Sequence, residues 1–113
     1  MSEPLTETPE RIDIVDNEDD RYFELRVDDA FAGLIVYESI GGRRVLTHTF
    51  VEEAYRGRGL GELMIGEVLD RLRAKGTTVS SLCPMVDRFV ESHPEYADLV
   101  DLGAKVHVDD GSP

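Results

Sequence analysis

The feature that most constrains this chain is a glycine-rich loop that joins a strand pattern to a helical pattern. Residues 45–51 are apolar and β-branched, which predicts a strand, and apolar residues recur at helical spacing from residue 60 onward. Three alternating glycines lie at this junction: Gly57, Gly59 and Gly61. Without Cβ atoms the loop backbone can approach a ligand closely, and its N–H groups and the helix dipole favour an anion. Arg56 and Arg58 add positive charge, so the junction predicts a phosphate or pyrophosphate site.

Spacing separates the glycine-loop families that bind phosphates. A Walker A loop requires a lysine, followed by Ser or Thr, directly after its last glycine, and no lysine follows these glycines. The dinucleotide fingerprint Gly-x-Gly-x-x-Gly fits Gly57 and Gly59, but Glu62 occupies its third glycine position and several strand-like segments precede the loop. The pattern that remains is Arg-x-x-Gly-x-Gly, which Arg56, Gly59 and Gly61 form.

This pattern resembles motif A of the Gcn5-related N-acetyltransferases (GNAT), whose loop amides hold the pyrophosphate of acetyl-CoA. Three further landmarks look like those of a small, stand-alone GNAT-like family of about a hundred residues, the size of one domain. They are His-Thr-Phe-Val at 48–51, Leu-Cys-Pro at 82–84 and His-Pro-Glu-Tyr at 93–96. The resemblance runs from about Arg21 to Val100. It departs from the family pattern at Glu53 and Ser81, where the family often has proline, and both positions shape the backbone rather than the chemistry.

The resemblance implies that the protein transfers acetyl from acetyl-CoA to a primary amine: a protein lysine, a protein N-terminus or a small amine. The cofactor-binding residues that it implies are Phe50, Val51, Arg56, Gly57, Arg58, Gly59, Leu60 and Gly61. The implied oxyanion donor is the backbone N–H of Phe50 or Val51. A non-catalytic module that binds acetyl-CoA or CoA is the alternative function.

His48 and Cys83 are the candidate catalytic residues, because the family's proposed active-site residues match these positions. His48 lies on the expected strand that leads into the loop, and Cys83 lies just past the end of the strand at 77–82. Both are therefore expected toward the carboxyl edge of the sheet, where open α/β sheets bind ligands. A histidine near a cysteine lowers the pKa of the thiol and creates a nucleophile. The ordinary interpretations are a small buried cysteine and a histidine satisfied by local hydrogen bonds. Direct attack by the amine and transfer through Cys83 both stay open.

Other polar residues have weaker claims to a chemical role. Tyr96 is a proton donor by analogy with the wider superfamily, or a residue that packs helices. His93 precedes a proline and predicts a helix boundary, and Glu52 and Glu53 are expected to be solvated loop charges. Because no Cys, His and Asp cluster has the spacing of a zinc site, we expect no metal.

Composition limits the class of protein further. The chain has 113 residues, which suffices for one domain, and no apolar run approaches the length of a transmembrane helix. Its N-terminus lacks the regions of a signal peptide, and its one cysteine fits a reducing cytoplasm. The net charge of -12 argues against nucleic acid. It attracts cationic amines or, in the ordinary interpretation, keeps the surface soluble. The oligomeric state is left open.

The order of the patterns predicts an α/β (α+β) fold, a minimal GNAT-like fold in which an antiparallel meander leads into one βαβ unit and short C-terminal helices. Expected strands cover 12–14, 22–27, 30–40 (buried on both faces), 43–51 and 77–82, and expected helices begin at 60, 84 and 94. Leu60, Leu63, Met64, Val68 and Leu72 form the apolar face of the first helix, and Gly76 ends it. The third helix would run through Val100, after which Leu102, Val106 and Val108 add a strand or an apolar anchor. The expected domain is 11–103, after a disordered leader (1–10) and before an acidic tail (104–113).

Overall fold

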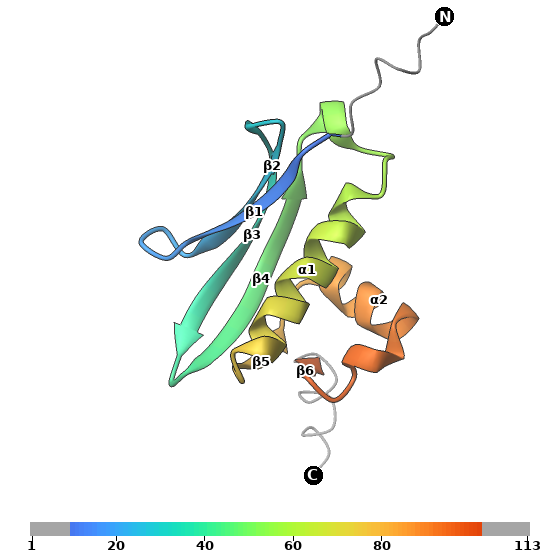
Figure 1. Cartoon of the computed structure of the whole chain (residues 1–113). Coiled ribbons are helices and arrows are strands. Elements are labelled where there is room, and N and C mark those ends of the chain that lie inside the picture. The colour runs from blue at the N-terminus through green and yellow to red at the C-terminus, as the bar shows by residue number, and fades with distance from the viewer. Residues whose placement is uncertain (1–9, 103–113) are drawn as a thin grey trace, which may run out of the picture.

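The computed structural model of this protein describes residues 10–102, which form one six-stranded sheet with two α-helices against it (Figure 1). The strands are β1 (Ile12–Asn17), β2 (Tyr22–Val27), β3 (Ala30–Ile40), β4 (Arg43–Val51), β5 (Thr78–Ser81) and β6 (Val100–Leu102). The helices are α1 (Leu60–Ala74) and α2 (Pro84–Ser92), with 3₁₀ turns η2 (Glu53–Tyr55) and η3 (Pro94–Tyr96). The strands lie in sequence order. The first four are antiparallel, and β4, β5 and β6 are parallel, which confirms the predicted meander and βαβ unit.

Two tight hairpins set the register of the meander. Gly41 and Gly42 join β3 to β4 with φ values of +57° and +82°, the left-handed conformation that a two-residue hairpin of type I′ requires. Asp28 and Asp29 join β2 to β3 with φ values of +51° and +73°. Aspartate tolerates this conformation better than most residues, and the Asp28 carboxylate also accepts a hydrogen bond from the Arg11 backbone N–H (2.9 Å).

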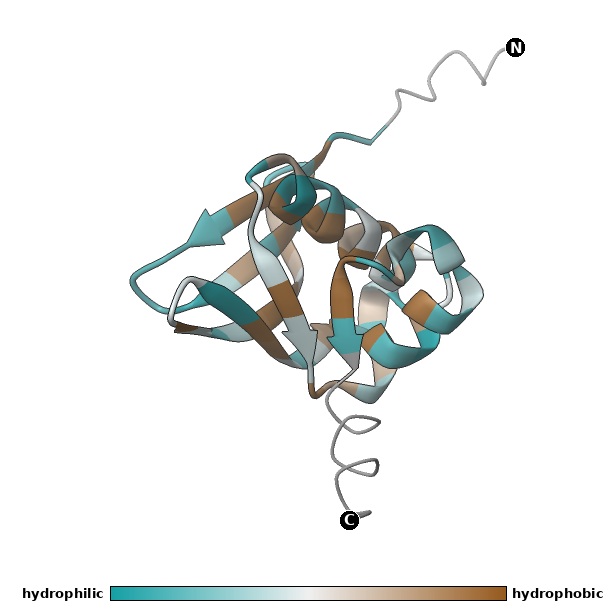
Figure 2. Cartoon of the chain, turned by 90° about the horizontal axis from the view of Figure 1, so that it is seen from below, coloured by the Kyte–Doolittle hydropathy of each residue, from teal (hydrophilic) through white to brown (hydrophobic). Residues whose placement is uncertain are grey.

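The expectation that β3 is buried on both faces is wrong. Its buried side chains include Ala32, Ile35 and Tyr37, whereas Phe31 and Ile40 are exposed. The reason is that both helices cover the same face of the sheet. They contact β4, β5 and each other, and no helix of residues 10–102 lies against the opposite face (Figure 1). Hydrophobic and hydrophilic residues accordingly alternate along the strands (Figure 2).

Helix α1 begins and ends where the sequence predicts. Its buried side is formed by Leu60, Gly61, Met64, Ile65, Val68, Leu69 and Leu72. Leu63 was expected on that side but is 45% exposed. The buried residues of α1 are 60, 61, 64, 65, 68, 69 and 72, and Leu63 lies at the edge of the surface that they form. The helix ends in a Schellman motif: Gly76 has φ +70° and donates to Arg73 O, while the Thr77 N–H donates to Leu72 O.

The segment after β5 differs from the prediction in one element. Helix α2 begins at Pro84 as expected, with proline in its first turn. Residues 94–96 form only a 3₁₀ turn rather than a helix through Val100, because Val100 pairs with Val79 and starts β6. Val106, Val108, the 104–113 tail and residues 1–9 of the leader lie outside the described residues. Within the described part of the chain, no helix is long and apolar enough to cross a membrane.

Gly33 tests how tightly β3 and β4 must approach. A Cβ at this position would lie 2.5 Å from the Phe50 carbonyl oxygen, and a backbone atom cannot move aside without shifting β4. We expect Gly33→Ala to lower the free energy of unfolding in urea by about 1–3 kcal/mol. Ser39→Ala, at an exposed position of the same strand, should change it by less than about 0.5 kcal/mol. Equal stabilities of the two variants would contradict the close approach.

Candidate functional site

The site begins where β4 and β5 separate. The two strands pair only over Arg43–Leu46 and Thr78–Ser81, and the last bond between them runs from the Leu82 N–H to the Leu46 carbonyl (2.9 Å). Residues 47–51 of β4 still pair with β3 on one side. On the other side the chain after β5 turns into α2. The carboxyl half of β4 therefore has an open edge, which faces the start of α2.

A β-bulge at Thr47 decides which way the residues of this half-strand point. His48 pairs with Val36 and Leu46 pairs with Tyr37, so Thr47 is an extra residue on β4. After the bulge, Thr49 and the buried Val51 face the helices, and His48 and Phe50 are exposed on the opposite face. Adjacent strand residues alternate in this way. The site thus receives Thr49 and Val51, not their neighbours.

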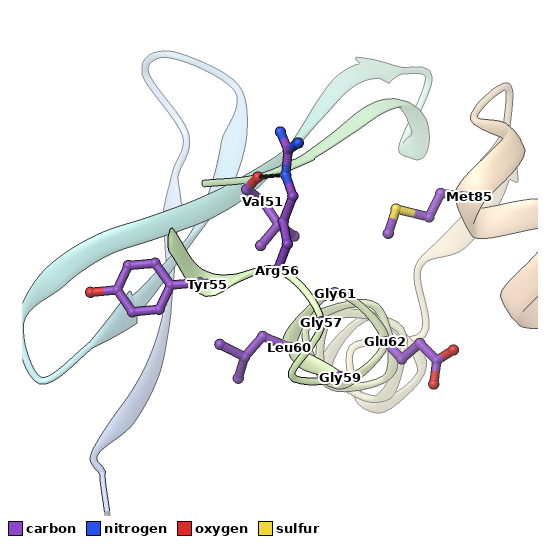
Figure 3. Close-up of a pocket in the computed structure, with 9 residues that line it drawn as sticks. All are labelled: Val51, Tyr55, Arg56, Gly57, Gly59, Leu60, Gly61, Glu62 and Met85. Carbon is purple, nitrogen blue, oxygen red and sulfur yellow. Dashed lines mark hydrogen bonds between the residues drawn. The ribbon is translucent and has the colours of Figure 1, made fainter. Parts of the chain in front are cut away.

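The backbone of β4 alternates as well. The Glu52 N–H donates to Ala32 O of the neighbouring strand segment (2.8 Å). Since successive residues of a strand direct their N–H and C=O groups to opposite sides, the N–H of Phe50 also faces β3, and the N–H groups of Thr49 and Val51 face the open edge. Arg56 Nε donates to the carbonyl of Val51 on that side (2.8 Å; Figure 3). Of Phe50 and Val51, the two predicted oxyanion donors, Val51 is the one whose N–H faces the open edge.

The glycine loop folds over the end of β4 and leads into α1. Gly57 and Gly59 have φ values of +78° and +77°, which side chains rarely tolerate. Gly61 is required for a different reason, because a Cβ there would lie 2.9 Å from the Met85 Cε and 3.4 Å from the Val51 Cγ2. No side chain caps the first turn of α1, although the Leu63 N–H bonds to Gly59 O. The backbone N–H groups of residues 60–62 therefore remain available to an anion.

The loop and the first turn of α1 line a pocket of about 290 Å³ (Figure 3). Its lining residues are Val51, Tyr55, Arg56, Gly57, Gly59, Leu60, Gly61, Glu62 and Met85. The pocket contains most of the predicted cofactor-binding residues, but not Phe50 or Arg58. Phe50 is on the opposite face, and Arg58 forms an ion pair with Glu10 and lies over the Tyr55 ring (5.5 Å).

Three lining residues were not among the predicted ligands. Tyr55 directly precedes the Arg-x-x-Gly-x-Gly pattern, and no motif in the sequence marks it as a ligand. Glu62 stands at the third glycine position of the dinucleotide fingerprint, where its type gives no sign of a ligand contact. Met85 comes from α2, and nothing in the local sequence signals its contact, because this contact depends on how α2 packs against α1.

Cys83 lies at the open edge, in a fixed backbone setting. It is buried, and its Sγ lies 3.3 Å from the Thr49 Oγ1. Its backbone N–H donates to the Ser81 hydroxyl (3.2 Å), which in turn donates to the Asp87 carboxylate (2.6 Å). Ser81 is itself fully buried. In this chain a hydroxyl at position 81, where the family often has proline, shapes the turn that presents Cys83.

The structure does not bring His48 and Cys83 together as a hydrogen-bonded pair. The His48 ring is exposed, and its Nδ1 lies 3.2 Å from the Thr47 Oγ1. Because Thr49 contacts Cys83 and strand neighbours alternate, His48 lies on the opposite face of β4. Both residues flank the same open edge, from its two sides.

Comparison with known proteins assigns the family. The family model described as GCN5-related N-acetyl-transferase matches residues 22–99. This chain belongs to the GCN5-related N-acetyltransferase family. The match covers β2 to β5, the glycine loop and both α-helices, and it confirms the predicted family.

Individual relatives of this GNAT are distant. Protein NATD1 of Danio rerio is 29% identical over 84 residues, which cover 71% of this chain and 76% of that protein. Protein NATD1 of Bos taurus is 34% identical over 62 residues, 54% of this chain and 55% of that protein.

Two solved structures are also similar to this GNAT. One is a ribosomal-protein-alanine N-acetyltransferase from Brucella melitensis biovar Abortus 2308, with a TM-score of 0.45 at 19% identity, over 72% of this chain and 63% of that chain. The other is a GCN5-related N-acetyltransferase from Kribbella flavida, with a TM-score of 0.43 at 23% identity, over 67% and 30% of the two chains.

The remaining candidates of this GNAT have structural roles or none in the site. His93 ends α2, where its Nδ1 lies 2.9 Å from the Phe89 carbonyl and its ring stacks on Phe89. The Tyr96 hydroxyl donates a hydrogen bond to Asp70 of α1 (2.7 Å), and this bond holds η3 against that helix. Among residues 10–102, no group of three or more His, Cys, Asp or Glu side chains is arranged to hold a metal ion.

The Tyr96–Asp70 contact predicts a pH dependence. The hydrogen bond to Asp70, with burial, raises the pKa of Tyr96 to about 12. Since an unfolded tyrosine titrates near about 10, the contact stabilises the fold fully below pH 10 and its contribution is lost as the pH rises through about 12. We expect Asp70→Asn to lower this pKa in a spectrophotometric titration, with Tyr96→Phe identifying the transition. Superimposable curves for wild type and Asp70→Asn would contradict the assignment.

Proposed function

We propose that this protein binds acetyl-CoA and transfers its acetyl group to a primary amine. The observation that carries the proposal is the continuity between the glycine loop, with its outward N–H groups, and the open edge of β4, which ends beside Cys83. A pyrophosphate at the loop would leave the acyl arm of the ligand to run along this edge. Membership in the acetyltransferase family supports the same ligand.

The residues of the open edge suit a thioester. The N–H groups of Thr49 and Val51 point into the edge and can donate to carbonyl oxygens of the acyl arm, including the one that becomes negative during transfer. Backbone donors are held in place by the β3–β4 ladder, so they require little reorganisation. We assign Val51 as the principal oxyanion donor, since it also lines the pocket that holds the pyrophosphate.

The two sides of β4 would receive the two substrates. The acyl donor occupies the helix-covered side, whereas the amine approaches from the uncovered face, where His48 is exposed. In this arrangement the amine nitrogen attacks the thioester carbon, His48 takes the proton from the amine, and the carbon–sulfur bond breaks. The Cys83 thiol lies at the thioester end and can protonate the departing CoA thiolate.

Direct attack is the mechanism that the contacts favour. A covalent route through Cys83 needs a base that removes the thiol proton. The Cys83 Sγ contacts the Thr49 hydroxyl, which is not such a base, and the His48 imidazole lies on the other face of β4. The positively charged amines that this acidic protein attracts must lose one proton before they attack. The exposed His48 can accept that proton and release it to water, and it is then free to accept the second proton during attack.

Binding is the first test of the proposal. Calorimetric titration should show binding of both acetyl-CoA and CoA, and Gly59→Glu should weaken it at least tenfold, about 1.4 kcal/mol. A carboxylate would then stand where the pyrophosphate binds. Gly42→Glu is the matched control, since Gly42 has a similar φ (+82° against +77°) and equally open surroundings but lies in the distant β3–β4 hairpin. No binding by wild type, or equal affinities of the two variants, would refute the site.

Turnover separates the enzyme from a binding module. With lysine-containing peptides, free N-terminal peptides and polyamines as acceptors, His48→Gln should lower kcat by about 10²–10⁴-fold while the affinity for acetyl-CoA is kept. Cys83→Ala should also lower kcat. Release of the CoA thiol reports the rate, and intact mass reports any acetyl group on the protein. Acetylated Cys83 would favour the covalent route, and tight binding without turnover of any acceptor would favour a non-catalytic module.

A further inference from the structure

A second cavity adjoins the loop pocket and lies between the two helices; we call it the α1–α2 groove. It has a volume of about 300 Å³ and is lined by Glu62, Ile65, Met85, Arg88, Phe89 and Ser92. Glu62 and Met85 line both cavities, so the groove adjoins the loop pocket, where the pyrophosphate is proposed to bind. Helices α1 and α2 pack together here: a Cβ at Gly61 would touch Met85, and one at Gly66 would touch Phe89. The groove is thus part of the helix interface.

Arg88 is the cation of this groove. It is exposed on the second turn of α2 and makes no hydrogen bond or ion pair with another residue of 10–102. Its situation differs from that of Arg58 and Arg73, which pair with Glu10 and Asp98. In a chain with 24 acidic and 12 basic residues, an arginine beside a cavity and without a carboxylate partner is placed to receive an external anion.

The shape of CoA matches two cavities that meet at a pyrophosphate site. Two arms leave its pyrophosphate: the pantetheine arm, which carries the thioester, and an adenosine that bears a 3′-phosphate. The open edge of β4 leads away from the loop pocket on the side of Cys83, and the α1–α2 groove leads away past Met85. If the first arm follows β4, the groove is the space left for the second.

We propose that the α1–α2 groove binds the adenosine 3′-phosphate arm of CoA and that Arg88 recognises the 3′-phosphate. The inference rests on the proposed function. The half-buried Met85 side chain, with Phe89 beside it, supplies apolar surface for the adenine ring. The guanidinium of Arg88 donates to the phosphate oxygens in a charge-assisted, bidentate geometry. The Glu62 carboxylate would repel a phosphate and suits the donor groups of the nucleoside, which places the phosphate at the Arg88 end.

The test compares CoA with dephospho-CoA, which lacks only the 3′-phosphate. By calorimetry at low salt, wild type should bind CoA about tenfold more tightly than dephospho-CoA, the preference expected of one charge-assisted contact in an exposed groove. Arg88→Gln should abolish this preference by weakening CoA alone, with dephospho-CoA unchanged. Arg88→Lys should keep part of it, because a point charge replaces the bidentate fork.

Lys75→Gln is the matched control. It removes the same charge from an exposed cation at the far end of α1, and it should leave the preference intact. A loss of preference in this variant would show a general charge effect and would overturn the assignment to Arg88. The same holds if wild type binds both ligands equally or if Arg88→Gln weakens both by the same factor. Absence of binding by either ligand would instead refute the proposed function itself.

Discussion

The β-bulge at Thr47 is the constraint on which the rest of the site depends. Before the bulge, the even-numbered residue Leu46 faces the core, and after it the odd-numbered Thr49 and Val51 do. Without the extra residue, His48 and Phe50 would lie under the helices instead. The same residue marks the place where β5 leaves β4, since the last bond between them is to the Leu46 carbonyl. A single inserted residue therefore opens the edge and also selects the groups that line it.

Binding of the proposed CoA ligand requires the loop to attract an anion in a chain of net charge -12. The arginines beside the loop contribute less to this than their number suggests. Arg56 holds the loop by donating Nε to Val51 O, and Arg58 is paired with Glu10. The fixed backbone N–H groups of the loop and of α1, with the dipole of a fifteen-residue helix, are the larger source of attraction. These donors cannot be neutralised by neighbouring carboxylates in the way that flexible arginines can.

The extent to which the sequence predicts this protein depends on how local each feature is. The antiparallel meander, the start of α1 at residue 60 and its end at Gly76 follow from neighbouring residues, and the structure confirms them. The errors concern tertiary information. Whether β3 is buried on both faces and whether Leu63 is buried depend on where the helices pack. The helix expected after Pro94 is replaced by a short turn because Val100 pairs with Val79.

The site follows the same division. The glycines of the loop can be recognised in the sequence, because a left-handed φ or a close contact at these positions excludes most residues that have a Cβ atom. His48 and Cys83 were expected to be near each other because both lie toward the carboxyl edge of the sheet, an argument that does not say on which face of β4 His48 lies. The bulge that decides this face has no signature in the residues around Thr47. Met85 and Arg88 lie on α2. Their place beside the loop could not be predicted, because it depends on how α2 packs against α1 in the folded protein.

The placement of both helices on one face has a consequence for the chemistry. Strands β4, β5 and β6 follow one another in order, so right-handed crossovers place α1 and α2 on the same side. That side holds the loop pocket and the groove, and no helix of residues 10–102 covers the other. A proposed acceptor amine would meet an open sheet face beside His48 rather than an enclosed pocket. Selection among acceptors would then rest on charge and on the few side chains around His48, because no helical wall in the described chain excludes a bulky substrate.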